Sequence, residues 1–201
     1  MDLGLPSGTL WATCNVGASK PSEAGLYFAW GDTQGYSADQ VGTGEGQKKF
    51  SEDYSDYKWY LSGTIDDDNL KFKKYTIPGT ALDLEDDAAH VNMGGDWHMP
   101  TPTQINELIN NTTNTWTTQD NVKGRLFTSK NNGKSIFIPA AGSAWNGSVQ
   151  SSGSGGRGYV WSSVLNTNDV NIGQYLGFLS GFVYLGDFNR YLGLSVRGVV
   201  G

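Results

Sequence analysis

The segment from Tyr175 to Arg197 constrains the fold and use of this chain more than any other part of the sequence. It is rich in Leu, Gly, Phe and Tyr, and it holds no Lys, Glu, Gln, Met or Trp, although these five types make up 32 of the 201 residues. None of the five has a codon that ends in a pyrimidine, whereas every residue type in the segment has one. Randomising both adenines of AAC codons would leave this signature. We therefore expect variable side chains here, held on a backbone frame that does not vary.

A period of two separates the expected frame from the expected variable positions, because successive side chains of a strand point to opposite faces. The predicted core positions are Leu176, Phe178 and Val183. Their neighbours fall on the opposite face, and these are Tyr175, Gly177, Leu179, Phe182 and Tyr184. Residues 185–188 show no useful period and are predicted to form a loop. The alternative is a buried strand pair that is apolar on both faces.

The composition favours one loop-rich α+β domain with short strands. The 201 residues include 28 Gly and only 6 Pro, which suits short strands and many turns, and the length suits one domain. The net charge is −6, with no basic stripe, so we expect no nucleic-acid partner. No run of 18 apolar residues is present, so we expect no membrane insertion by this domain.

The single cysteine and the start of the sequence bear on disulfide formation and on a leader segment. Cys14 is the single cysteine, so no intramolecular disulfide can form. It falls on the apolar side of a predicted strand over residues 9–16, together with Leu10, Ala12 and Val16, and we interpret it as a small buried hydrophobe and not a nucleophile. No signal peptide precedes the first motif. We expect that a leader was trimmed, because the first motif begins almost at the first residue.

Helix signals occur at two places. Acidic residues open a predicted helix over residues 83–91, in which Leu84, Ala88 and Val91 would share a face. A second helix is predicted to start at Thr101 with a capping box closed by Gln104. Its buried face would hold Ile105, Leu108 and Ile109, and it would end at residues 110–111.

The remaining pattern predicts short strands and loops. Strands are expected over residues 25–32, 124–129, 135–139 and 159–163, with a hairpin turn at 130–134. Residues 112–120 are expected to be a polar connection, and residues 143–157 a mobile loop.

Metal and cofactor sites are not indicated. Residues 64–69 carry three consecutive acids at 66–68, which suit either a calcium loop or a solvated acidic turn; we favour the turn, because the alternating spacing of a calcium loop is missing. His90 and His98 are the only histidines, which excludes a site of three or more, and each is expected to make a structural hydrogen bond.

Six motifs, taken in order, carry a resemblance to a known family. They are DLGLPSGTLWATCNVG (2–17), FAWGD (28–32), GGDWHMPT (94–101), IFIPAAG (136–142), GYVWSS (158–163) and SVR (195–197). Together they resemble the bacterial paralogous surface-protein domain related to formylglycine-generating enzyme, which has a C-type-lectin-like fold. The tail further resembles the variable proteins of diversity-generating retroelements, in which adenines are replaced during error-prone copying of a template.

The resemblance implies a single domain over residues 1–201, with a variable ligand-binding region at about 160–197. It also implies a location at a cell surface, outside the cell or on a phage virion. Carried onto this sequence, the varied positions would be Tyr175, Gly177, Leu179, Phe182, Tyr184, Gly186, Asp187, Phe188, Tyr191 and Leu192, with Leu185 and Ile172 as further candidates. These side chains are expected to be exposed. The frame would be Leu176, Phe178, Val183, Arg190 and Gly193.

The expected function is ligand binding without catalysis or cofactor. The related oxidases need a pair of reactive cysteines, which this chain lacks, and the loop and disulfides of calcium-dependent sugar-binding lectins are also missing. We expect a protein ligand first and a glycan second, since Tyr and Phe supply large contact area at low entropic cost. The alternative is a structural or adhesin module of a pilus, cell surface or phage tail, in which the apolar tail is a fixed subunit interface.

Overall fold

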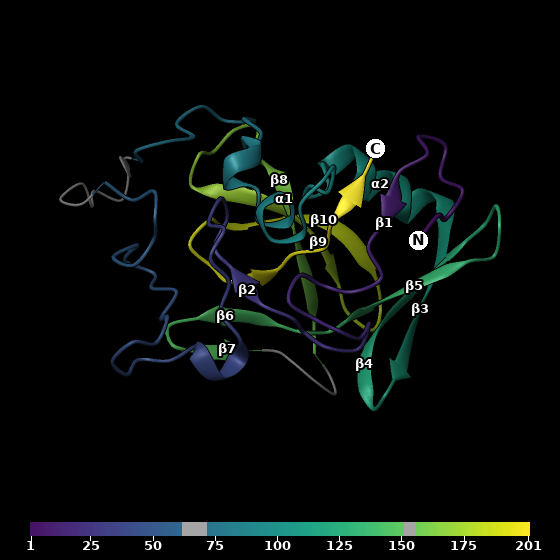
Figure 1. Ribbon diagram of the computed structural model, residues 1–201, viewed down its shortest axis with the longest axis horizontal. Coiled ribbons are helices and arrows are strands. Elements are labelled where there is room, and N and C mark those ends of the chain that lie inside the picture. The colour runs from purple at the N-terminus through teal and green to yellow at the C-terminus, as the bar shows by residue number, and fades with distance from the viewer. Residues whose placement is uncertain (62–71, 151–155) are drawn as a thin grey trace.

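The computed structural model describes residues 1–61, 72–150 and 156–201, and it is a mixed α+β fold built mostly of strands (Figure 1). A five-stranded sheet has the order β10-β9-β8-β11-β2. Its members are β2 (Tyr27–Phe28), β8 (Gly158–Leu165), β9 (Ile172–Phe178), β10 (Val183–Asn189) and β11 (Leu194–Ser195). A three-stranded antiparallel sheet contains β3 (Thr112–Gln119), β4 (Val122–Ser129) and β5 (Ser135–Pro139). The predicted α+β class is thus confirmed.

Two small sheets and four short helices complete the described part of the chain. β6 (Ser143–Trp145) pairs with β7 (Ser148–Gln150), and β1 (Leu10–Trp11) pairs with β12 (Val199–Val200), which brings the two termini close together (Figure 1). The helices are η1 (Ala38–Gln40), η2 (Leu84–Asp86), α1 (Ala88–Met93) and α2 (Pro102–Asn111). None of these helices has the length and apolarity needed to span a bilayer.

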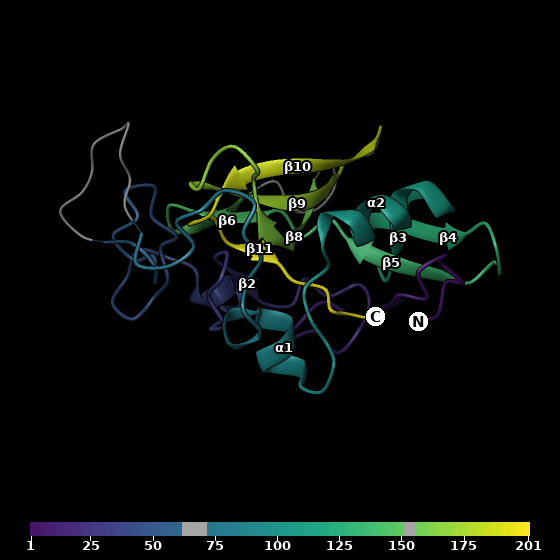
Figure 2. The ribbon, with the colours of Figure 1, turned by 90° about the horizontal axis from the view of Figure 1, so that it is seen from above.

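The core lies on both sides of the five-stranded sheet. One cluster is rich in aromatic rings and includes Trp30, Trp161 and Tyr175. The other is mainly aliphatic and packs α2 and the three-stranded sheet against the opposite face of β9, where it includes Leu176 and Phe178. Figure 2 shows β8, β9 and β10 as one layer, with α2 and β3–β5 beside it. Because its side chains alternate between two cores, β9 is buried on both faces.

Helix α2 forms as predicted. The Thr101 hydroxyl accepts the backbone N–H of Gln104 at 3.3 Å, and the Gln104 amide oxygen accepts the backbone N–H of Thr101 at 2.9 Å. Ile105 and Leu108 are buried, and Ile109 packs against the same cluster. The local capping signal and the apolar period agree here, and tertiary packing does not override them.

The prediction of one continuous helix over residues 83–91 is wrong. A 3-10 turn at η2 is followed by a new helix, α1, because the Asp87 carboxylate accepts the N–H groups of Ala89 and His90 and caps a fresh N-terminus. Leu84 and Val91 are exposed, so they do not share a buried face with Ala88.

Several predicted strands also differ. The expected connection at 112–120 is strand β3, paired with β4 along its whole length, since Thr is a good strand former even without an apolar period. The predicted loop at 185–188 belongs to β10. Residues 143–157 include the β6–β7 hairpin, and 151–155 lie outside the described residues. The expected strands at 9–16 and 25–32 shrink to two residues each.

The inward face predicted for residues 9–16 is confirmed at Ala12 and Val16, which are buried, and is wrong at Leu10. Trp11 is completely buried and Leu10 is exposed, while Cys14 is half-buried and not part of the core. Burying the larger Trp ring gains more from the hydrophobic effect than burying Leu10. The histidine prediction is confirmed: His90 Nδ1 lies 3.2 Å from the carbonyl oxygen of Trp97, and His98 Nδ1 lies 2.9 Å from that of Met99.

Candidate ligand-binding face

The β9–β10 hairpin sets an aromatic ring opposite a glycine at three successive positions on one face. Tyr184 lies opposite Gly177, Gly186 opposite Tyr175, and Phe188 opposite Gly173. A Cβ on Gly177 would lie only 2.6 Å from Tyr184 Cζ and 2.7 Å from Tyr175 Cε2. A Cβ on Gly186 would lie 2.7 Å from Tyr175 Cζ. The glycines therefore leave the space into which the neighbouring rings fold.

These rings form a continuous row, which we call the aromatic face: Phe182, Tyr184, Tyr175, Phe188 and Tyr159. Successive ring centroids are 5.5 Å, 6.0 Å, 4.7 Å and 5.1 Å apart, and the Tyr175–Phe188 pair is stacked. Phe182 is 57% exposed, Tyr184 and Phe188 are half-buried, and Tyr175 and Tyr159 are each 4% exposed. The aromatic face thus runs from solvent at the hairpin tip down to the core.

A pocket of ≈ 300 Å³ opens at the inner end of the aromatic face. Phe188 and Tyr159 form part of its wall. The rest comes from the β6–β7 region and from the chain around β10: Ser143, Trp145, Gln150, Asn189, Tyr191 and Leu192. This volume lies at the lower end of the range found for small-molecule sites. The lining combines aromatic rings with amide and hydroxyl groups.

The structure places the predicted variable residues at three depths. Phe182 and Asp187 are exposed, and Leu179, Tyr184, Leu185, Gly186, Phe188 and Ile172 are half-buried. The prediction of exposure is wrong for Tyr175, Gly177, Tyr191 and Leu192, all of which are buried. Tyr175 is covered by the rings of Tyr159, Tyr184 and Phe188. Tyr191 packs edge-on against Tyr54, with ring centroids 4.7 Å apart.

Not all of the predicted positions lie on one face. Leu185 packs with Val183 against the aliphatic cluster on the other side of the sheet. Asp187 has the same strand parity as Leu185, and its carboxylate accepts a hydrogen bond from Asn166 Nδ2 at 2.9 Å. The alternation of β10 therefore separates these two residues from the aromatic face.

Five residues that line the pocket were not predicted from the sequence: Ser143, Trp145, Gln150, Tyr159 and Asn189. The strand pattern around Tyr159 is visible in the sequence. Its partner is not, because only the β8–β9 register brings Tyr159 opposite Gly177. Trp145 reaches the pocket through a hairpin that the sequence suggested to be a loop.

The hydroxyls of Tyr175 and Tyr159 are neutral near physiological pH. Burial raises the pKa of Tyr175, and its contact with the Tyr184 hydroxyl raises it further. Burial also raises the pKa of Tyr159. The Tyr175 hydroxyl contacts that of Tyr184, and the Tyr159 hydroxyl interacts with the Arg157 side chain. Of the two tyrosines, only Tyr159 lines the pocket.

Arg190 anchors the end of β10 and has the burial expected of a frame residue. Its side chain is completely buried, with Nε donating to the Tyr57 hydroxyl at 2.8 Å. Nη1 donates to the carbonyl oxygens of Tyr75 and Val170, and Nη2 to that of Lys74, at 3.0–3.2 Å. The guanidinium carbon lies 4.0 Å from the centre of the Phe72 ring. The anchor thereby ties the hairpin to Tyr57 and to residues 72–75.

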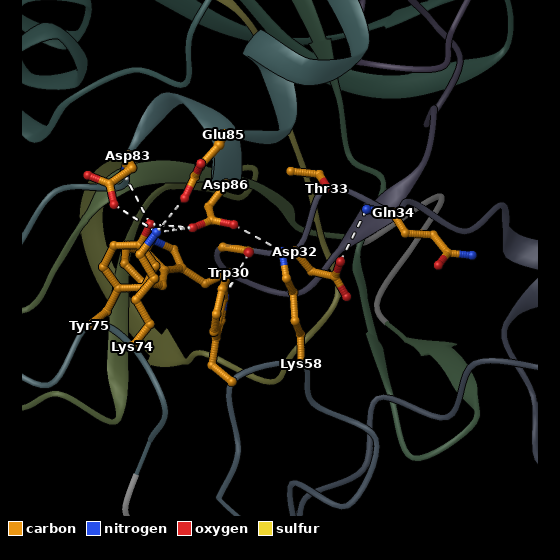
Figure 3. Close-up of polar contacts among 12 residues, drawn as sticks. Trp30, Asp32, Thr33, Gln34, Lys58, Lys74, Tyr75, Asp83, Glu85 and Asp86 are labelled. Atoms are coloured by element: carbon orange, nitrogen blue, oxygen red, sulfur yellow. Dashed lines mark hydrogen bonds and ion pairs between the residues drawn. The ribbon is translucent and has the colours of Figure 1, made fainter.

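Three carboxylates near η2 have the spacing of a metal site but are already occupied by a lysine. Oxygens of Asp83, Glu85 and Asp86 lie within 4.8 Å of one another. Lys74 Nζ contacts all three at 2.7 Å, 3.0 Å and 2.7 Å (Figure 3). These contacts, the one with Asp83 above all, raise the pKa of Lys74. A metal cation would have to displace the ammonium group, so the three carboxylates and Lys74 form a network of ion pairs. Residues 66–68, for which the sequence suggested a solvated acidic turn or a calcium loop, lie outside the described residues.

Comparison of the sequence with protein-family models finds no matching family, and comparisons with curated proteins and with solved structures find no match either.

Proposed function

We propose that this chain is a non-catalytic binding domain that contacts its ligand through the β9–β10 hairpin. The contact surface comprises the tip of the hairpin, the aromatic face and the adjoining pocket. The observation that carries the proposal is the continuous row of rings from the exposed Phe182 to the pocket at Phe188. An exposed apolar ring at Phe182 that continues into the half-buried rings of Tyr184 and Phe188 favours an interaction site.

We further propose that the fold is C-type-lectin-like and that the tail is varied by a retroelement of the kind its motifs resemble. The burial of the frame residues Leu176, Phe178 and Arg190 supports this proposal, because a frame must hold its shape while other positions change. The setting would be a cell surface, the extracellular space or a virion.

A protein ligand suits the aromatic face better than a glycan does. Phe182 and Phe188 have no polar group to offer, and the exposed tip is a large apolar ring. Aromatic residues, Phe among them, are enriched in protein–protein interfaces relative to the rest of the surface. The amide and hydroxyl groups of Gln150, Asn189 and Ser143 favour a glycan only in the pocket.

Two display libraries of the full chain would test the proposal. The first randomises Leu179, Phe182 and Tyr184. The matched control randomises three exposed apolar residues elsewhere: Ile77, Leu84 and Val91. We expect selection against a common panel of purified proteins to yield binders from the first library only. Equal yields from both libraries, or none from the first, would refute the proposal.

The fixed-interface alternative has a single observation in its favour, the 57% exposure of Phe182 at the hairpin tip. If the tip joins subunits, the molar mass in solution will rise with concentration, and Phe182→Ala will abolish the rise. A mass that is independent of concentration contradicts this alternative.

A further inference from the structure

Strand β10 is an edge strand of the five-stranded sheet. Within the described residues, β9 is the only strand hydrogen-bonded to it, and Figure 2 shows β10 along the outside of its layer. Strand β3 is also an edge strand, but it contributes nothing to the aromatic face. At β10 an unpaired backbone edge and the proposed binding surface coincide.

The alternation of hydrogen-bonded and non-hydrogen-bonded pairs in the hairpin shows which N–H and C=O groups of β10 do not bond to β9. The Arg190 N–H donates to the Asn171 carbonyl at 2.9 Å, and the Leu179 N–H donates to the Phe182 carbonyl at 3.1 Å. The register between these two hydrogen bonds is continuous. The even-numbered residues of β10 therefore form the backbone hydrogen bonds to β9. In an antiparallel pair the alternate residues direct both groups away from the partner. Val183, Leu185 and Asp187 therefore present their N–H and C=O groups outward.

These six groups have no backbone partner within the described part of the chain. They recur every second residue, which is the spacing at which an added strand presents its own donors and acceptors. Natural edge strands are commonly protected by proline, lysine or a bulge. Strand β10 has no proline or lysine, and its seven residues pair with β9 without a register shift.

The negative charge of Asp187 favours a basic side chain on an added strand. It is exposed, and none of the ion pairs formed by the described residues includes it. A lysine or arginine on an added strand would lie within reach of its carboxylate, since cross-strand pairs of opposite charge are favourable.

We propose that β10 accepts an extended segment of a protein partner as a sixth strand, with a basic side chain beside Asp187. This inference rests on the proposed function, because both put the partner on the same hairpin. It adds the mode of recognition: main-chain hydrogen bonds at the edge hold the segment, and the neighbouring rings select its side chains.

The test uses short linear peptides selected from a displayed random library against the full chain, and compares Asp187→Pro with Asp187→Ala. Proline removes the outward N–H of residue 187 and is tolerated at such edge positions, whereas alanine removes only the carboxylate. We expect the proline variant to bind the peptides more weakly than the alanine variant by roughly tenfold. Peptide binding should also slow amide hydrogen exchange at Val183, Leu185 and Asp187.

A second measurement covers the case in which Asp187→Pro does not fold. Peptides methylated on the backbone nitrogens of one edge are compared with peptides methylated on the other. Methylation of one edge alone should abolish binding. Equal tolerance of both edges would overturn the inference.

The remaining outcomes separate the inference from the proposed function. If Phe182→Ala weakens binding while Asp187→Pro and Asp187→Ala behave alike, the face binds but the edge does not. If no peptide is recovered, or if none of the three substitutions weakens binding, the strand-addition inference fails, and the yields of the two display libraries alone decide on the proposed function. If the free chain forms dimers in which these three amides are protected, a second copy fills the edge, and the peptide proposal is wrong.

Discussion

Two buried arginines should respond in opposite directions to the same substitution. Arg125 on β4 and Arg190 at the end of β10 are 4% and 0% exposed. Arg190 donates to three backbone carbonyls and a hydroxyl. Arg125 Nε is buried without a hydrogen-bond partner, and no carboxylate among the described residues forms an ion pair with Arg125. Burial accordingly lowers the pKa of Arg125.

The expected magnitudes follow from these contacts. Arg190→Met leaves the carbonyls of Lys74, Tyr75 and Val170 without this donor, and each buried unsatisfied group costs about 1–3 kcal/mol. Allowing for relaxation, we expect a loss of roughly 3–5 kcal/mol in the free energy of unfolding. Arg125→Met removes a poorly solvated cation and keeps most of the volume. We expect a change between roughly zero and a gain of 2 kcal/mol.

Urea unfolding, followed by tryptophan fluorescence and far-ultraviolet circular dichroism, measures both values. Asn171 and Tyr57, which lie beside Arg190, stay unchanged in both variants, so the comparison isolates the two guanidinium groups. If Arg125→Met destabilises the chain as strongly as Arg190→Met, the reasoning from hydrogen-bond partners is refuted.

Three further predictions concern packing, pH and capping. Gly177→Ala should lower stability by roughly 1–3 kcal/mol because its Cβ meets two tyrosine rings, whereas Gly181→Ala, with open space around it, should be neutral; thermal unfolding compares them. Burial raises the pKa of Tyr27 from 10 to about 12, so its contribution to stability is present below pH 10 and is lost as the pH rises toward 12; Tyr27→Phe should flatten that decline in urea titrations. Thr101→Ala removes the α2 cap and should cost about 1 kcal/mol in urea unfolding, while a neutral result would contradict the capping geometry.

Local signals in the sequence predicted part of this fold well. The capping box and the apolar period that predict helix α2 both lie within the eleven residues from Thr101 to Asn111. The β4–β5 hairpin follows from two apolar runs around an Asn-Gly turn. In both cases the interactions that decide the structure are close in the sequence, so pattern and structure agree.

The candidate site depends on contacts between distant segments, and this limited its prediction. The period of two correctly assigned Leu176 and Phe178 to the core. It did not show that Tyr175 is buried as well, because the rings that cover Tyr175 come from β8 and β10. The burial of Tyr191 depends in the same way on Tyr54, more than a hundred residues away. Glycine opposite each ring becomes meaningful only once the register is known.

Sequencing the 3′ end of the gene from many clones of the source population tests the central claim most directly. If the β9–β10 hairpin is a diversified binding surface, differences will concentrate in its codons, at sites that are adenine in a nearby template copy. They will include Leu179, Phe182 and Tyr184, and they will spare Leu176, Phe178 and Arg190. A 3′ end as uniform as the rest of the gene would contradict the claim and favour a fixed interface.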